Sequence, residues 1–126
     1  MIAQCGFRTD CLHGDKNQVD RDQVLKDLKS GALHCVVATD VASRGLDIGT
    51  VKTVVSLDAP RDIETHVHRV GRTGRAGSRD GVAHTVLLPS DYRFAAHLVR
   101  SLIRATQPVP RPLMALAQKV GLKPKP

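Results

Sequence analysis

Apolar residues gather in three short runs that are typical of buried strands. The runs cover residues 34–39, 51–57 and 82–88, written HCVVAT, VKTVVSL and VAHTVLL. Because they are rich in valine and almost continuous in apolar residues, they predict strands buried on both faces of a parallel sheet. A more mixed segment at 7–13 predicts a further strand before a turn at Gly14.

Helical patterns alternate with these strands. Residues 17–30 carry an apolar stripe and stop at Gly31, and further helices are expected near 62–70, 91–105 and 113–120. Strand and helix in alternation predict an α/β fold with a parallel sheet flanked by helices. In such sheets, functional residues gather in the loops at the carboxyl ends of the strands.

The chain has 126 residues, which is enough for at most one domain. Gly6 resembles the left-handed cap that closes a helix, so the chain is expected to begin inside an element whose start is missing. The proline-rich segment at 108–112 separates a domain at 1–105 from a C-terminal extension at 106–126, which holds a short helix and a tail.

Composition narrows the class of protein. Apolar residues make up 41% of the chain and charged residues 25%, values that favour a packed globular core over disorder. No apolar run approaches the ~20 residues of a membrane span, and the N-terminus lacks a secretory pattern. We therefore expect an intracellular protein without membrane contact. The three cysteines are expected to be reduced thiols.

Basic residues are concentrated in the second half of the chain. Residues 1–63 hold eight Lys or Arg against nine Asp or Glu, and residues 64–126 hold eleven against three, so the halves carry −1 and +8. Twelve of the 19 basic residues are arginine, whose planar fork suits phosphate contacts. A polyanionic partner is one interpretation, and a basic surface that only confers solubility is the other.

Two other binding chemistries receive little support. His66 and His68 lie two apart on a predicted helix and point away from each other, so no metal site is predicted. Only three residues, Phe7, Tyr92 and Phe94, are aromatic. A platform for stacking bases would need more, so contacts to a nucleic-acid backbone fit better.

The segment HRVGRTGRAG, at 68–77, interleaves arginines with glycines. Arg69, Arg72 and Arg75 stand three apart, with a glycine between each pair. Glycines weaken a continued helix and allow tight turns, so the guanidinium groups would reach outward from a loop, an arrangement that suits a multiply charged phosphate. The alternative is a flexible basic loop.

Two more segments place polar groups at strand ends. ATDVASRGLDI follows the strand at 34–39, where Thr39 could donate to a phosphate and Asp47 could contact a ribose. The alternative is a helix cap by Asp40 and a structural pair of Arg44 with Asp47. LHGDKNQVDR opens a helix, whose first amides favour an anion.

Together these segments resemble the second RecA-like domain of DEAD-box RNA helicases. LHGD with Gln18 and Arg21, ATDVASRGLDI, the aspartate of VVSLD and HRVGRTGRAG follow one another in that family's order and spacing over about residues 1–105. The resemblance implies the C-terminal lobe of an ATP-dependent RNA helicase with a RecA-like sheet.

The resemblance also implies roles toward ATP. Arg72 and Arg75 match the arginine fingers on the γ-phosphate, and His68 matches the histidine that links this segment to the acidic ATPase motif of the first domain. Gly45 and Asp47 match residues of the family that line the nucleotide site, where the residue matching Asp47 contacts the ribose.

Toward RNA, the resemblance assigns Gly14, Arg21 and Thr39 to the grip on the sugar-phosphate backbone. Asp58 matches the aspartate that links the segment after Thr39 with HRVGRTGRAG. Such contacts would bind RNA irrespective of sequence and more weakly at high salt.

The chain departs from the full family pattern. The resemblance implies that the strand carrying motif IV should precede Met1, so the first strands of the RecA-like sheet are expected to be missing. It contains no GxxxxGK[ST] phosphate loop and no DEAD tetrapeptide, so the N-terminal RecA-like domain, which would hold Mg²⁺, is an expected partner and the chain alone is expected to be inactive. His66 replaces the family's usual tyrosine, which resembles the splicing-associated branch and suggests the nucleus. Three alternatives are a stand-alone RNA- or partner-binding fragment without ATPase activity, a decayed fragment that does not fold, and a DNA helicase of the wider superfamily.

Overall fold

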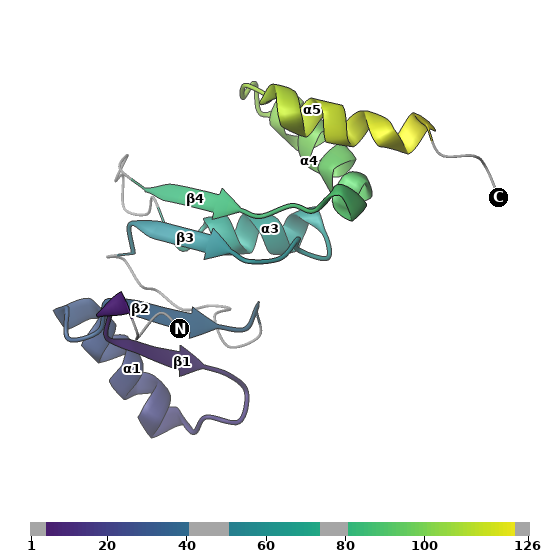
Figure 1. Ribbon diagram of the computed structural model, residues 1–126. Helices are drawn as coiled ribbons and strands as arrows, with labels where there is room; N and C mark the ends of the chain where they lie inside the picture. The colour runs from purple at the N-terminus through teal and green to yellow at the C-terminus, as the bar shows by residue number, and fades with distance from the viewer. Residues whose placement is uncertain (1–4, 41–50, 74–80, 123–126) are drawn as a thin grey trace.

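The computed structural model describes residues 5–40, 51–73 and 81–122 (Figure 1). The strands are β1 (Thr9–Leu12), β2 (Cys35–Ala38), β3 (Thr53–Ser56) and β4 (Val82–Thr85). The α-helices are α1 (Gln18–Ser30), α3 (Ile63–Val70), α4 (Tyr92–Arg104) and α5 (Arg111–Ala117), with 3₁₀ turns η2 (Pro89–Asp91) and η3 (Gln118–Leu122). Each predicted strand and helix is present, and the alternating α/β order is confirmed.

The strands form two parallel pairs in the described residues. β1 pairs with β2, with Leu12 opposite Ala38, and β3 pairs with β4, with Ser56 opposite Thr85. Helix α1 packs on the first pair and α3 contacts β3 (Figure 1). Leu12 of β1 and Val24 of α1 form the buried core between α1 and the β1–β2 pair.

The prediction that these strands are buried on both faces is wrong. Val37 in β2 is 45% exposed and Val55 in β3 is 53% exposed. Residues that alternate along a strand point to opposite faces, and in the described residues α1 and α3 each cover a single face. The continuous apolar runs therefore predicted cover on both faces of the strands, whereas the described residues leave one face partly exposed.

A second apolar core joins α4 to α5. Ala95, Val99 and Ala117 are buried together, and Phe94 and Leu98 are also buried on α4. Helix α5 begins at Arg111, ahead of the predicted start, since a proline near a helix start needs no intrahelical N–H bond. The boundary predicted at residue 105 stays a prediction, with α5 packed directly on α4.

The helix ends are those that the sequence favours. The Asn17 side chain accepts from the Asp20 amide at 2.8 Å, and the Asp62 side chain accepts from the Thr65 amide at 2.8 Å. Gly31 closes α1 at φ 85°, and Gly6 has φ 87°, so both take the left-handed conformation. Among the described residues, no helix is long and apolar enough to cross a membrane.

Candidate functional site

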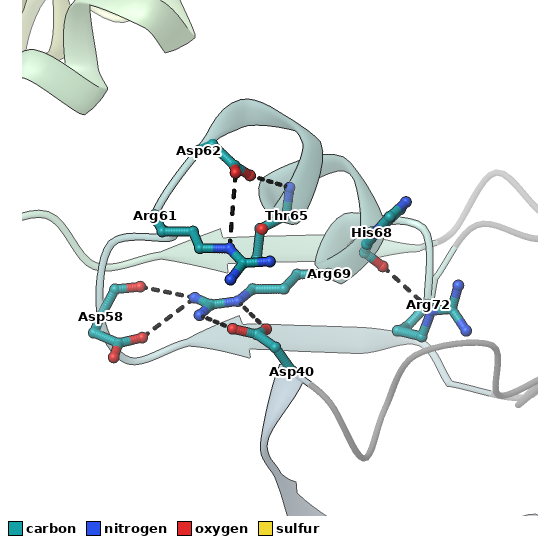
Figure 2. A network of polar contacts seen from close by, with 8 residues as sticks. All are labelled: Asp40, Asp58, Arg61, Asp62, Thr65, His68, Arg69 and Arg72. Carbon is teal, nitrogen blue, oxygen red and sulfur yellow. Dashed lines mark hydrogen bonds and ion pairs between the residues drawn. The ribbon is translucent and has the colours of Figure 1, made fainter.

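The central feature of the site is the side chain of Arg69. Its Nε and Nη2 donate to the two carboxylate oxygens of Asp40 at 2.7 and 2.8 Å, which is a bidentate pair (Figure 2). Its Nη1 donates to the backbone oxygen of Asp58 at 2.9 Å and to the Asp58 carboxylate at 3.2 Å. One guanidinium thus ties α3 to the residues that follow β2 and β3.

The two carboxylates that Arg69 binds differ in how far they are exposed to solvent. The Arg69 side chain is 17% exposed, Asp40 is 43% exposed and Asp58 is 83% exposed. The hydrogen bond to Asp40 is the main reason that the pKa of Arg69 is raised, although partial burial opposes the shift. Asp40 is therefore the principal counter-charge, because solvent screens the Asp58 carboxylate more strongly.

His68 and Arg72 lie at the C-terminal end of α3, away from Asp58 (Figure 2). Arg72 Nε donates to the backbone oxygen of His68 at 3.2 Å, and the Arg72 amide donates to the backbone oxygen of Arg69 at 3.2 Å. The Thr73 hydroxyl donates to the backbone oxygen of Lys52 at 2.8 Å. The turn that presents Arg72 is thereby fixed to the residue that precedes β3.

This position differs from the predicted gathering of chemistry at the carboxyl ends of the strands. Thr39 and Asp58 do follow β2 and β3, but Arg72 lies near the start of β3, because α3 runs back along the sheet after leaving Asp58. Arg72 and Asp58 therefore lie near opposite ends of β3 (Figure 2). Arg69 spans the distance between them.

The predicted RNA-contacting residues surround the ends of β1 and β2. The Thr39 amide donates to the backbone oxygen of Leu12 at 3.2 Å, which joins the two strand ends. Gly14 is exposed in the turn that follows β1, and Arg21 lies half-buried in the first turns of α1. The structure therefore brings Gly14 and Thr39 to the carboxyl ends of β1 and β2, with Arg21 in the helix that follows Gly14.

An ion pair holds the turn between β1 and α1. Lys16 Nζ binds Asp10 Oδ1 at 2.9 Å and donates to the Cys11 backbone oxygen at 2.6 Å. The hydrogen bond from Lys16 is the main cause that lowers the pKa of Asp10. Gln18, at the helix start, donates to Asp22 Oδ1 at 2.7 Å. The turn that carries Gly14 is therefore anchored on both sides.

Three predicted site residues, Gly45, Asp47 and Arg75, lie outside the described residues, as does Arg44. The sequence predicts that the Arg69 guanidinium, like those of Arg72 and Arg75, reaches outward from a loop toward phosphate. The structure differs, because Arg69 lies on α3 and its side chain is bound to Asp40 and Asp58. Its role in joining the two strand ends was not predicted. The available signal was a pair of aspartates, each two residues after a strand, with an arginine on the helix that follows the second strand. Two negative charges that are brought close together favour such a partner.

His66 packs against α4 and is not one of the candidate site residues. His66 packs edge-on against Phe94, with ring centroids 5.8 Å apart. Partial burial is the main cause that lowers the pKa of His66, and the charge of Arg69 adds to it. In the described part of the chain, no three His, Cys, Asp or Glu side chains are grouped as metal ligands.

Comparison with known proteins identifies the fold and its motifs. Residues 1–77 match the family described as the helicase conserved C-terminal domain. The chain belongs to this family. It is 53% identical over 120 residues to the DEAD-box ATP-dependent RNA helicase 24 of Oryza sativa subsp. japonica, and 50% identical over 118 residues to the ATP-dependent RNA helicase DDX42 of Homo sapiens.

Solved structures support the same assignment. A crystal structure of the RNA helicase Prp28 from Chaetomium thermophilum bound to ADP matches with a TM-score of 0.79 and 40% identity over 89% of this chain and 28% of that one. The E. coli DEAD-box protein SrmB bound to RraA matches with a TM-score of 0.64 and 31% identity over 75% of this chain and 69% of that one. The predicted RecA-like fold and DEAD-box resemblance are confirmed.

The chain is short relative to its relatives. It aligns over 95% of its own length with the rice helicase but covers 16% of that protein, and over 94% with human DDX42 but covers 12%. The alignment therefore identifies a C-terminal helicase domain of the DEAD-box type. It covers too little of either relative to establish an activity that needs the whole protein.

Proposed function

We propose that this chain acts as the C-terminal lobe of an ATP-dependent DEAD-box RNA helicase, which binds ATP and the RNA backbone. The observation that supports it is the set of hydrogen bonds from Arg69 to Asp40 and Asp58, which we call the Arg69 clamp. Asp40 directly follows Thr39 in the candidate RNA-binding loop, and Arg69 is one turn ahead of Arg72. Hydrogen bonds therefore join the two candidate contact regions into one unit.

Toward ATP, Arg72 would stabilise the negative charge that spreads over the transferring phosphoryl oxygens. Its half-buried position and its bond to the His68 carbonyl limit the freedom of the side chain, so less entropy is lost when a phosphate binds. Arg75 would add a second guanidinium, and Gly45 and Asp47 would form the ribose edge. His68 would link this lobe to the other one.

Toward RNA, Gly14, Arg21 and Thr39 would contact the sugar-phosphate backbone. Thr39 is exposed and its backbone is fixed to Leu12, so its hydroxyl offers a donor from a defined position. Arg21, on α1, would supply positive charge to the same grip. None of these groups would read base identity, which agrees with the small number of aromatic residues.

The second half of the nucleotide site would come from an N-terminal RecA-like domain. That domain would hold the phosphate loop and Mg²⁺, and closure of the two lobes on ATP and RNA would complete the active site. The similarity to a yeast DEAD-box splicing factor, Prp28, at 27% identity, supports a nuclear location as part of the same proposal.

The test replaces Arg72 with alanine in the full-length helicase. We expect RNA-stimulated ATP turnover to fall by about 10³-fold or more, because a finger arginine acts on the transition state. RNA affinity should stay close to wild type, since Arg72 is not among the residues assigned to the RNA grip. Arg93→Ala is the matched control, because Arg93 is an exposed arginine on α4.

Wild-type turnover in the Arg72→Ala protein would disprove the finger assignment. If the full-length protein binds RNA in a salt-sensitive manner but never hydrolyses ATP, the stand-alone RNA-binding alternative applies. The +8 charge of residues 64–126 is the observation that favours that alternative.

A further inference from the structure

A basic hollow lies between α3 and α4, apart from the site described above. It has a volume of about 440 Å³ and is lined by Ile63, His97, Arg100, Ser101, Arg104 and Ala105. We call these six residues the α4 hollow. In Figure 1 helix α4 lies beyond the β3–β4 pair, away from the β1–β2 ends where RNA contact is proposed.

The basic side chains share one face of α4. His97, Arg100 and Arg104 are spaced three and four residues apart, so they follow one another along the helix surface. All three side chains are exposed, whereas Phe94 and Leu98 on the other face are buried. Within the described ranges, neither Arg100 nor Arg104 forms an ion pair, so their charges are not neutralised there.

Two acidic side chains flank Ile63 in the sequence, and one of them is already engaged. The Asp62 side chain caps the α3 amide of Thr65 and lies 3.7 Å from Arg61 Nε. Glu64 is exposed next to Ile63. The hollow therefore offers two guanidinium groups about 5–6 Å apart at their Cβ atoms, beside the apolar surface of Ile63 and Ala105.

We propose that the α4 hollow docks an acidic segment of a partner protein that carries one apolar side chain. Carboxylates one helical turn apart, or two residues apart in an extended chain, match the spacing of Arg100 and Arg104. The apolar side chain would rest on Ile63 and Ala105. RNA fits less well, because the lining contains apolar surface at Ile63 and Ala105 that a phosphate backbone would leave uncovered.

The experiment measures binding of a fluorescein-labelled oligoglutamate peptide with one central leucine to the full chain by fluorescence anisotropy. The test variant is Arg100→Glu with Arg104→Glu. The matched control is Arg93→Glu with Arg111→Glu, which makes the same change in net charge at exposed arginines outside the hollow. Circular dichroism and thermal melting check that each variant folds as the wild type does.

We expect peptide affinity to fall about tenfold or more in the hollow variant and to change much less in the control. Raising the salt concentration should weaken the wild-type complex, and an oligoglutamine peptide with the same leucine should not bind. Equal losses in both variants, or no binding by wild type, would overturn the proposal. So would displacement of the peptide by single-stranded polyuridine combined with loss of polyuridine binding in the hollow variant, which would show a nucleic-acid surface instead. The ATPase and RNA experiments above are independent of this result.

Discussion

At the scale of single residues, the Arg69 clamp depends on the shape of the guanidinium as well as on its charge. Replacing Arg69 by lysine keeps the charge but removes the bidentate bond to Asp40 and the parallel bond to the Asp58 carbonyl. We expect Arg69→Lys to lower the free energy of unfolding by about 1 kcal/mol, a value reduced by the exposure of both carboxylates. Urea denaturation of wild type and variant measures the difference.

Asp40 and Asp58 provide an internal control for this prediction. Asp58→Asn should change stability by less than about 0.5 kcal/mol, because the Asp58 carboxylate is exposed and its backbone oxygen still accepts from Arg69. Asp40→Asn should cost more, because it weakens the principal counter-charge of a largely buried arginine. The reverse order would contradict the assignment of Asp40 as the main partner.

His66 makes stability depend on pH. Its folded-state pKa is lowered, so the unfolded chain binds the proton more readily, and acidification favours unfolding. The contribution is complete above the ordinary histidine pKa of about 6.5 and is lost as the pH falls through the lower folded value. Thermal melting from about pH 7.5 to about pH 5 should show a decline in Tm that is smaller in His66→Phe. An unchanged pH profile in this variant would exclude His66 as the cause.

At the scale of secondary-structure elements, the end of α1 depends on a left-handed residue. Gly31 has φ 85°, a conformation that a β-carbon disfavours even though such an atom would meet nothing within 4 Å. Gly31→Ala should therefore destabilise the fold by about 1 kcal/mol, and Gly31→Asn by less, because asparagine tolerates this conformation. Chemical denaturation distinguishes the two. Equal effects of both substitutions would argue that the cap conformation is not the cause.

Element types were largely predictable from the sequence, because apolar runs and helix caps are local signals. Asn17, Gly31 and Asp62 mark helix ends by side-chain and backbone preferences that need no tertiary information. Exposure was less predictable: Val37 and Val55 belong to apolar runs, but whether a layer covers them depends on how elements are placed in space.

The sequence indicated which residues belong to the candidate site, but not the hydrogen bonds that join them. Glycine and arginine spacing indicated phosphate contacts around Arg72, and the resemblance supplied the expected roles. The bonds of Arg69 to Asp40 and Asp58 join positions 29 and 11 residues apart, so only the crossover of α3 over the sheet brings them together. Long-range partners of this kind are not encoded in local spacing.

At the scale of the whole molecule, charge and site position together predict how RNA binding responds to salt. Arg21 is proposed to belong with Thr39 to the backbone grip, whereas the basic excess is in residues 64–126. In the full-length protein, Arg21→Gln should weaken binding of all single-stranded RNA sequences to a similar extent. It should also reduce the slope of log affinity against log salt by about 0.7, since one phosphate contact with a single strand is lost.

Lys119→Gln serves as the control for this prediction, because it removes one exposed basic charge from η3, remote in sequence from the candidate grip. A general effect of net charge would make both substitutions reduce the salt slope equally, since long-range attraction depends on total charge. A specific phosphate contact would reduce it for Arg21→Gln alone. The comparison of slopes, measured by filter binding over a range of salt concentrations, therefore separates an RNA-binding edge from a uniformly basic surface.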